Sequence, residues 1–508
     1  CQQVHADLPV HCLRHQVVGK WRFKLSPMRD ARSSCGHQHP DLEEQQPSRQ
    51  VVDSEEGTTQ LMVNVENPNS VTSEGATKGT WTMVYDEGFE VNVKGLSFFA
   101  FSNFTFEGNP ANPQEKKHNM SHCGETMIGW YENNNRTRFG CYYGVKVDQQ
   151  PEKSATDLAH HALKILEGMP PAKSNSSVSW DKPLDNATQS KVVKKLNHKL
   201  GLLQLGWRAR EMKKWNGRTM REVNSYVGLK RAQPRKEMHR EMLRLRAGAS
   251  TGARSFLQKG APAAKSKSSL PASFDWSNVS GLNYLEPVVD QADCGSCYAV
   301  SSVRMLTARH KIRQNDTAAL PWSISFPLHC SEYNQGCKGG YGFLLAKWSS
   351  DVGLLPATCM RYNTGGSCKL ECDLEKLGSK RFRAANHRYV GSYYGHSNAE
   401  TIKEELYRNG PLAVGVEPDE DFMYYSDGIF KSANSKSKVG PREWEQVDHG
   451  VLLVGWGEED GQKYWRIQNS WGPDWGEDGF FRIAYGSDES AVESMAEAAD
   501  VIEDEQSG

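Results

Sequence analysis

Cys297 is the residue whose surroundings best suit covalent chemistry. It ends the stretch Gln291–Cys297, Gln-Ala-Asp-Cys-Gly-Ser-Cys, after which apolar residues recur at helical spacing at Ala299, Val303 and Leu306. We therefore expect Cys297 at the N-terminus of a helix, where unpaired N–H groups and the helix dipole favour a thiolate over a thiol. Such a nucleophile also requires a basic partner and donors for the oxyanion that forms on its substrate.

Two later segments carry polar residues that suit this thiol. His449 precedes an apolar run that is typical of a buried strand, and Asn469 ends a second such strand. The sequence Glu-Asp-Gly at 459–461 predicts a hairpin turn between them, so that the strands pair opposite the Cys297 helix. The alternative for a lone cysteine or histidine is a core residue or a disulfide, but three such segments in this order argue against it.

The motif Cys-Gly-Ser-Cys-Tyr at 294–298, with His449 and Asn469 far downstream, resembles the signature of the papain family of cysteine peptidases. The resemblance implies that Cys297 is the nucleophile and that His449 is its base and then the acid for the leaving amine. Asn469 is expected to hold the imidazole in plane. Gln291 matches the family's oxyanion-hole glutamine, for which an ordinary surface glutamine is the alternative.

Two more features match the family where substrate is bound. Trp471 resembles the tryptophan that shields the Asn–His pair. The run Gly-Cys-Lys-Gly-Gly at 336–340 resembles the glycine strip, where substrate backbone runs against bare main chain, with Gly339 and Gly340 as the contacts. A simple turn next to a disulfide is the alternative.

The cysteines and glycosylation sequons indicate a secreted protein. Of twelve cysteines, one is the expected nucleophile, Cys1 is an outlier and ten fall in local clusters, as in a disulfide framework. Asn-x-Ser/Thr sequons occur at Asn103, Asn119, Asn135, Asn175, Asn186, Asn278 and Asn315. We expect the secretory pathway, ending in a lysosome, a similar vesicle or the extracellular space. Zinc is the alternative for clustered cysteines, but the spacings lack a second set of ligands, so we expect no metal.

Charge and hydropathy set further limits. The 508 residues carry a net charge of −1, yet Lys191–Lys267 alone has 21 Lys and Arg against four Asp and Glu. No run approaches 18 apolar residues, so we expect no membrane span. The basic run has apolar spacing that suits packing against an acidic partner, with Leu196, Leu200, Leu203 and Trp207 on one helical face. Binding of a polyanion is the alternative, but we expect no nucleic acid.

Short alternating stretches separated by turn signals fill the region before residue 150. They are Trp21–Leu25, Leu61–Val65, Trp81–Val93 with a turn at 86–88, Leu96–Phe106, Thr126–Tyr131 and Cys141–Val147. This pattern predicts an antiparallel barrel or sandwich. Its motifs, such as Cys-Gly-Glu-Thr-Met-Ile-Gly-Trp at 123–130, resemble the exclusion domain of the cathepsin C (dipeptidyl peptidase I) family. With the catalytic half, the likeness runs from Asp7 to about Ile502.

This resemblance implies an α+β protein. A papain-like two-lobed catalytic domain, a helical lobe plus a β-barrel lobe, would follow an all-β antiparallel barrel exclusion domain and a helical propeptide. The expected divisions are 1–6, a signal-peptide remnant; 7–150, the exclusion domain; 151–269, linker and propeptide; and 270–508, the peptidase domain. The propeptide helix is expected from 191 to about 248. The implied disulfides are Cys12–Cys123, Cys35–Cys141, Cys294–Cys337, Cys330–Cys368 and Cys359–Cys372, and a homotetramer is implied by the same likeness.

Chloride binding is expected to be impaired. Cathepsin C has a tyrosine shortly after the glycine strip that helps to bind chloride at the S2 pocket, the pocket for the second substrate residue. The aligned residue here is Phe343, which has no hydroxyl, whereas Tyr389 matches the second chloride tyrosine. We therefore expect chloride to bind weakly or not at all.

The expected function is that of a cysteine exopeptidase that removes dipeptides from free N-termini of peptides and proteins. Other proteases would activate it by excising the basic segment and cutting within Lys431–Arg442. Asp7, the first residue after a predicted cleavage at Ala6, would bind the substrate ammonium; a solvated residue at a frayed terminus is the alternative. For the whole protein, the alternatives are a cathepsin-like endopeptidase and a non-catalytic binding protein whose barrel is an interaction module.

Overall fold

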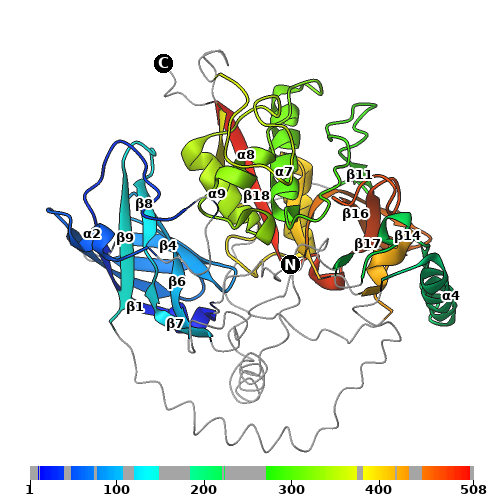
Figure 1. The fold of residues 1–508 in the computed structure, drawn as a ribbon, viewed down its shortest axis with the longest axis horizontal. Helices are drawn as coiled ribbons and strands as arrows, with labels where there is room; N and C mark the ends of the chain where they lie inside the picture. Colours follow the sequence, from blue (N-terminus) through cyan, green and yellow to red (C-terminus); the bar gives the residue numbers. More distant parts are fainter. Residues whose placement is uncertain are drawn as a thin grey trace, which may run out of the picture.

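The computed structural model describes residues 10, 12–38, 40, 47–73, 77–106, 119–147, 183–219, 222–223, 270–373, 382–417, 420–433 and 449–503. They form a barrel, drawn in blue and cyan in Figure 1, beside a larger domain of helices and a second sheet. Helix α4 (Asn186–Leu202) lies on the far side of that domain from the barrel. In the described part of the chain, no helix has the length and apolar character needed to cross a membrane.

The barrel confirms the predicted antiparallel β domain. Its strands are β1 (Gly19–Leu25), β2 (Thr59–Glu66), β3 (Ser70–Ser73), β4 (Thr77–Val84), β5 (Gly88–Val93), β6 (Leu96–Phe106), β7 (Asn119–Thr126), β8 (Gly129–Asn133) and β9 (Phe139–Lys146). Strand β1 pairs with β9 as well as β2, which closes the sheet. Strands β3 and β7 were not predicted, because their sequences are polar and do not alternate between apolar and polar residues.

Alternating side chains of the barrel strands fill its core. Trp21 and Phe23 of β1 are fully buried, and Phe23 packs on Phe98 and Tyr142 at centroid distances of 5.3 and 5.0 Å. Two short helices, α1 (Arg14–Val17) and α2 (Gln50–Asp53), lie at the ends of the barrel strands. The predicted disulfides Cys12–Cys123 and Cys35–Cys141 are both present and tie Cys12 to β7 and the loop at Cys35 to β9.

The larger domain has the predicted two-lobed arrangement. Helices α7 (Cys297–Gln314), α8 (Ser325–Cys330) and α9 (Gly342–Val352) form one lobe, and α10 (Ala399–Asn409) packs on the sheet of the other. The sheet strands are β12 (Phe382–Tyr389), β13 (Leu412–Val416), β14 (Tyr425–Phe430), β15 (His449–Glu459), β16 (Gln462–Gln468), β17 (Phe480–Ala484) and β18 (Ala496–Glu503), with short β11 (Phe274–Asp275) on β15. The three predicted disulfides Cys294–Cys337, Cys330–Cys368 and Cys359–Cys372 are present in this domain.

The basic segment is less helical than its spacing predicts. Helix α4 buries Leu196 and Leu200 as expected, but it ends at Leu202, and Leu203 is 51% exposed. The backbone then turns through Gln204, whose φ is +52°, and Trp207 begins strand β10 (Trp207–Ala209). This strand pairs with β14, and the Trp207 indole N–H donates to the Lys431 carbonyl at 2.8 Å. The predicted continuous helix is therefore wrong for 203–219, because tertiary strand pairing overrides helical spacing; most of 220–248 lies outside the described residues.

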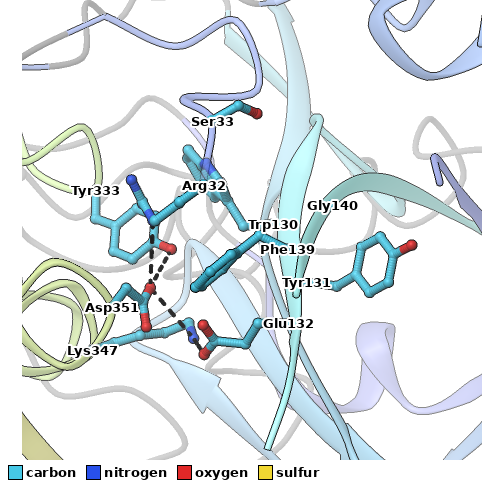
Figure 2. Close-up of a pocket in the computed structure, with 10 residues that line it drawn as sticks. All are labelled: Arg32, Ser33, Trp130, Tyr131, Glu132, Phe139, Gly140, Tyr333, Lys347 and Asp351. Atoms are coloured by element: carbon cyan, nitrogen blue, oxygen red, sulfur yellow. Dashed lines mark hydrogen bonds and ion pairs between the residues drawn. The ribbon is translucent and has the colours of Figure 1, made fainter. Parts of the chain in front are cut away.

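A buried charge cluster joins the barrel to α9. Figure 2 shows Lys347 and Asp351 of α9 facing Glu132 of β8 and Arg32. Lys347 Nζ lies 2.8 Å from Glu132 Oε1, and the Tyr333 hydroxyl donates to Asp351 at 2.8 Å. Because these charges are desolvated, each depends on its partner across the interface. Burial, reinforced by Asp351, raises the pKa of Glu132 to about 7.

Candidate active site

Cys297 lies where the sequence predicted, as the first residue of α7. The side chain is 3% exposed, and the ten other described cysteines form the five disulfides. The cystine Cys294–Cys337, together with a hydrogen bond of 2.9 Å from Gly295 N–H to the Cys337 carbonyl, fixes the loop that enters the helix. The thiol is thus held among the unpaired N–H groups of a helix N-terminus, which favour its ionised form.

His449 and Asn469 lie on paired strands, as predicted. His449 starts β15, Asn469 follows β16, and the two-residue turn between them has positive φ at Asp460 and Gly461, +50° and +76°. A Cβ added at Gly450 would lie 3.3 Å from the backbone N and Cα of Tyr298. Strand β15 therefore begins directly against the first turn of α7, which brings His449 to Cys297.

The hydrogen bonds of Asn469 assign the tautomer of His449. Asn469 Oδ1 accepts the backbone N–H of Ser470 at 2.8 Å, which identifies this atom as the amide oxygen. The same oxygen lies 2.7 Å from His449 Nε2, so Nε2 carries a proton and donates it. Nδ1 is left as the basic nitrogen of the imidazole. Trp471, fully buried, covers the ring with its centroid 4.9 Å away and a 27° interplanar angle.

Gln291 is fully buried, so it is not an ordinary surface glutamine. Its backbone N–H donates to the Ser470 carbonyl at 2.8 Å, and its side-chain Nε2 donates to the Cys294 carbonyl at 2.9 Å. The Ser470 hydroxyl donates to the amide oxygen of Gln291. These bonds position the Gln291 amide between the loop before Cys297 and the segment that follows Asn469.

The glycine strip lies against the first turn of α7. Gly339 has φ +119°, a region that favours glycine, and a Cβ added at Gly340 would lie 2.7 Å from the Tyr298 ring and 2.5 Å from Asn334 Oδ1. Side chains are therefore excluded here by packing, and the main chain is left bare.

A turn of the barrel lies just beyond this strip. The Tyr85 ring, between β4 and β5, is 4.8 Å from that of Tyr341 and 5.5 Å from that of Tyr394. At the same turn, the Asp86 carbonyl accepts the backbone N–H of Cys12 at 2.6 Å. Cys12 is thereby held at the turn that packs on Tyr341, the residue after the glycine strip; Asp7 itself lies outside the described residues.

Phe343 and Tyr389, the residues expected near chloride, stack at 4.6 Å with a 10° interplanar angle. Their neighbour Glu497 of β18, which is 5% exposed, was not predicted as a site residue from the sequence. Its carboxyl group lies at the N-terminus of α9, where a Cβ added at Gly342 would collide with Glu497 Oε2. The only available signal was a single glutamate among the small residues of Ala496–Ala499.

The basic segment contacts the same site from the other side. Lys214 Nζ donates to the Trp471 carbonyl at 2.6 Å and pairs with Asp290 Oδ2 at 3.0 Å. The buried Trp215 donates to the Met423 carbonyl at 3.1 Å. These contacts favour the expected packing against acidic residues over polyanion binding for this part of the segment.

Comparisons with known proteins agree with this geometry. Residues 270–499 match the family described as papain family cysteine protease, and residues 7–146 match the cathepsin C exclusion domain. The chain is 28% identical to cathepsin C of Schistosoma mansoni over 512 residues, covering 98% of this chain and 96% of that protein. It is 32% identical to a gut-specific cysteine proteinase of Caenorhabditis elegans, covering 45% of this chain and 73% of that protein.

Among solved structures, digestive procathepsin L 3 of Tenebrio molitor larval midgut aligns with a TM-score of 0.47 and 22% identity, over 62% of this chain and 89% of that chain. The family profiles and the curated relatives together give the assignment. The chain belongs to the papain family of cysteine proteases and carries a cathepsin C exclusion domain in front of its peptidase domain.

Proposed function

We propose that this cysteine protease is an exopeptidase that removes dipeptides from the free N-termini of peptides and proteins. The Cys297 thiolate attacks the scissile carbonyl, and His449, which has taken the thiol proton, delivers it to the leaving amine. The Gln291 side chain and the Cys297 backbone N–H stabilise the oxyanion. Water activated by His449 then hydrolyses the thioester and releases the dipeptide.

The observation that supports removal of two residues is the barrel turn at Tyr85 and Asp86. Tyr85 packs on Tyr341, the residue directly after the glycine strip, and Asp86 holds Cys12. An extended substrate that runs along the strip would meet this turn and the N-terminal segment. The free amine of a short N-terminal stretch would then lie within reach of that segment.

The decisive experiment compares one dipeptide amide substrate with a free and with an acetylated N-terminus, with Cys297→Ala as the inactive control. We expect hydrolysis of the free substrate alone, and successive loss of dipeptides from a longer peptide in mass spectra. Internal cleavage of the acetylated peptide would favour the endopeptidase alternative, and no thiol-dependent turnover of any substrate would favour the binding protein.

We also propose a zymogen of the secretory pathway, delivered to a lysosome or similar vesicle. The support is the disulfide framework and the contact of the basic segment with Trp471. A homotetramer is proposed by family resemblance, and sedimentation of the processed enzyme would test it.

A further inference from the structure

The N-terminus of helix α9 is occupied by a side chain of the protein itself. The helix begins at Gly342, and the backbone N–H of Phe343 is one of the donors that a helix leaves without an internal partner. Such a terminus attracts anions, because several N–H groups and the positive end of the dipole converge there. Here the Glu497 carboxyl group lies against the Cα of Gly342, so close that a Cβ on this residue would collide with Oε2.

Several elements fix Glu497 in this place. Its backbone on β18 lies opposite Tyr389 of β12 and Ala413 of β13. Tyr394 packs edge-on against Tyr389 at 5.4 Å, and the Tyr85 ring of the barrel lies 5.5 Å from that of Tyr394. The carboxyl group is therefore enclosed by an aromatic wall to which the barrel contributes one residue, directly beyond the glycine strip.

This arrangement does not fit the chloride ion that resemblance to cathepsin C implies near Phe343 and Tyr389. A bound anion there would need the space beside Gly342 at the start of α9, and the Glu497 carboxyl group already fills it. Ionised Glu497 would also repel a second anion at contact distance, and protonated Glu497 would still fill the space. Gly342 leaves room for this carboxylate, since any Cβ at that position would collide with it.

We propose that the carboxyl group of Glu497 is a permanent internal occupant of the anion position at the N-terminus of α9, so that the enzyme needs no chloride there. The proposal differs from the expectation based on Phe343 alone. If the missing hydroxyl were the cause, Phe343→Tyr would restore chloride binding. If occupancy by Glu497 is the cause, only removal of that side chain can do so.

The test measures melting temperature of the full chain in chloride, bromide and acetate at constant ionic strength, for wild type, Glu497→Ala and Phe343→Tyr. We expect no halide effect in wild type and Phe343→Tyr, and a rise of a few degrees in chloride or bromide for Glu497→Ala, because a ligand that binds only the folded state stabilises it. Crystals of Glu497→Ala soaked in bromide should show an anomalous peak beside the Phe343 nitrogen.

A halide-dependent melting temperature in wild type or in Phe343→Tyr would overturn the proposal, as would a folded Glu497→Ala protein without any halide response. If Glu497→Ala does not fold, the wild-type and Phe343→Tyr arms still decide the matter. The activity arm rests on the proposed dipeptidyl function: kcat/KM for a dipeptide substrate should change less than about twofold between chloride and acetate in wild type. The melting and crystallographic measurements do not depend on that function. Failure of the Glu497 proposal can therefore be distinguished from failure of the proposed dipeptidyl activity.

Discussion

Two cysteines three positions apart differ in role: one forms a disulfide and the other is the expected nucleophile. Cys294 is bonded to Cys337, whereas Cys297 starts α7. We expect Cys297→Ala to abolish labelling by a thiol-directed peptidase inhibitor and turnover, with the melting temperature retained. Cys294→Ala should lower the free energy of unfolding by about 2–5 kcal/mol, as loss of a native disulfide does. Labelling at Cys294 rather than Cys297, read by peptide mapping, would reverse the assignment.

Asp7 is the residue whose proposed role depends most on chain processing. Cleavage after Ala6 would place its carboxylate at a new N-terminus five residues before Cys12, which the barrel turn holds. A charge-assisted hydrogen bond to the substrate ammonium contributes roughly 1.5–3 kcal/mol to binding. This corresponds to about 10- to 150-fold in selectivity for a free amine over an acylated one.

Asp7→Ala should therefore raise KM for free-amine dipeptides and reduce discrimination against acylated ones, with Asp7→Asn as the matched control for charge. Retention of residues 1–6 should impair the same step. Wild-type kinetics of Asp7→Ala on both substrates would place the ammonium site elsewhere.

At the scale of elements, the segment that carries α4 and β10 restrains the site. Lys214 contacts both Trp471 and Asp290, while its neighbour Lys213 is exposed. We expect Lys214→Glu to increase the rate of active-site labelling of the unprocessed chain several-fold, because a glutamate would face Asp290 and lose the Trp471 carbonyl. Lys213→Glu should leave that rate unchanged; equal effects of both variants would show a general charge effect instead.

Proteolytic processing of the chain provides a second prediction at the scale of secondary-structure elements. N-terminal sequencing of the active enzyme should find one start near Leu270 and another just before Glu443, after excision of Lys191–Lys267 and a cut within Lys431–Arg442. The last described residue of that second stretch is Ala433, and the stretch separates β14 from β15, so a cut there leaves both strands paired. A fully active single chain that retains Lys191–Lys267 would contradict the activation proposal.

The whole molecule should become less stable as pH rises. Burial, with Asp351, raises the pKa of Glu132 from 4.5 to about 7, and burial raises that of Glu497 to about 8. The folded protein therefore holds protons that the unfolded chain has released above pH 4.5, so their stabilising contribution is lost as pH rises through about 7 and 8. Each group contributes a slope of at most about 1.4 kcal/mol per pH unit.

Urea unfolding between pH 5 and 8 should show this fall. Glu132→Gln should flatten it between about pH 5 and 7, since the glutamine cannot titrate, although loss of the Lys347 pair lowers stability at every pH. The exposed Glu56→Gln is the matched control and should keep the wild-type slope. A slope that Glu132→Gln leaves unchanged would show that the interface charges in Figure 2 do not set the pH dependence.

Local sequence was sufficient for the catalytic elements. The Cys297 helix, the 449–469 hairpin and most barrel strands follow from spacing and turn residues, because these patterns act over a few positions. The five disulfides came from family resemblance, since the spacing of ten cysteines leaves their pairing open, and the structure confirms them.

Only the tertiary structure decided which distant segments contact these elements. Trp207 is spaced from Leu203 as on a helix, yet it lies in strand β10, because this strand pairs with β14 more than 200 residues away. Glu497 lies between two alanines in β18, and only the meeting of this strand with the N-terminus of α9 places its carboxyl group against Gly342. Spacing determines which residues share a face, but a buried charge is stabilised by partners that topology brings from elsewhere in the chain.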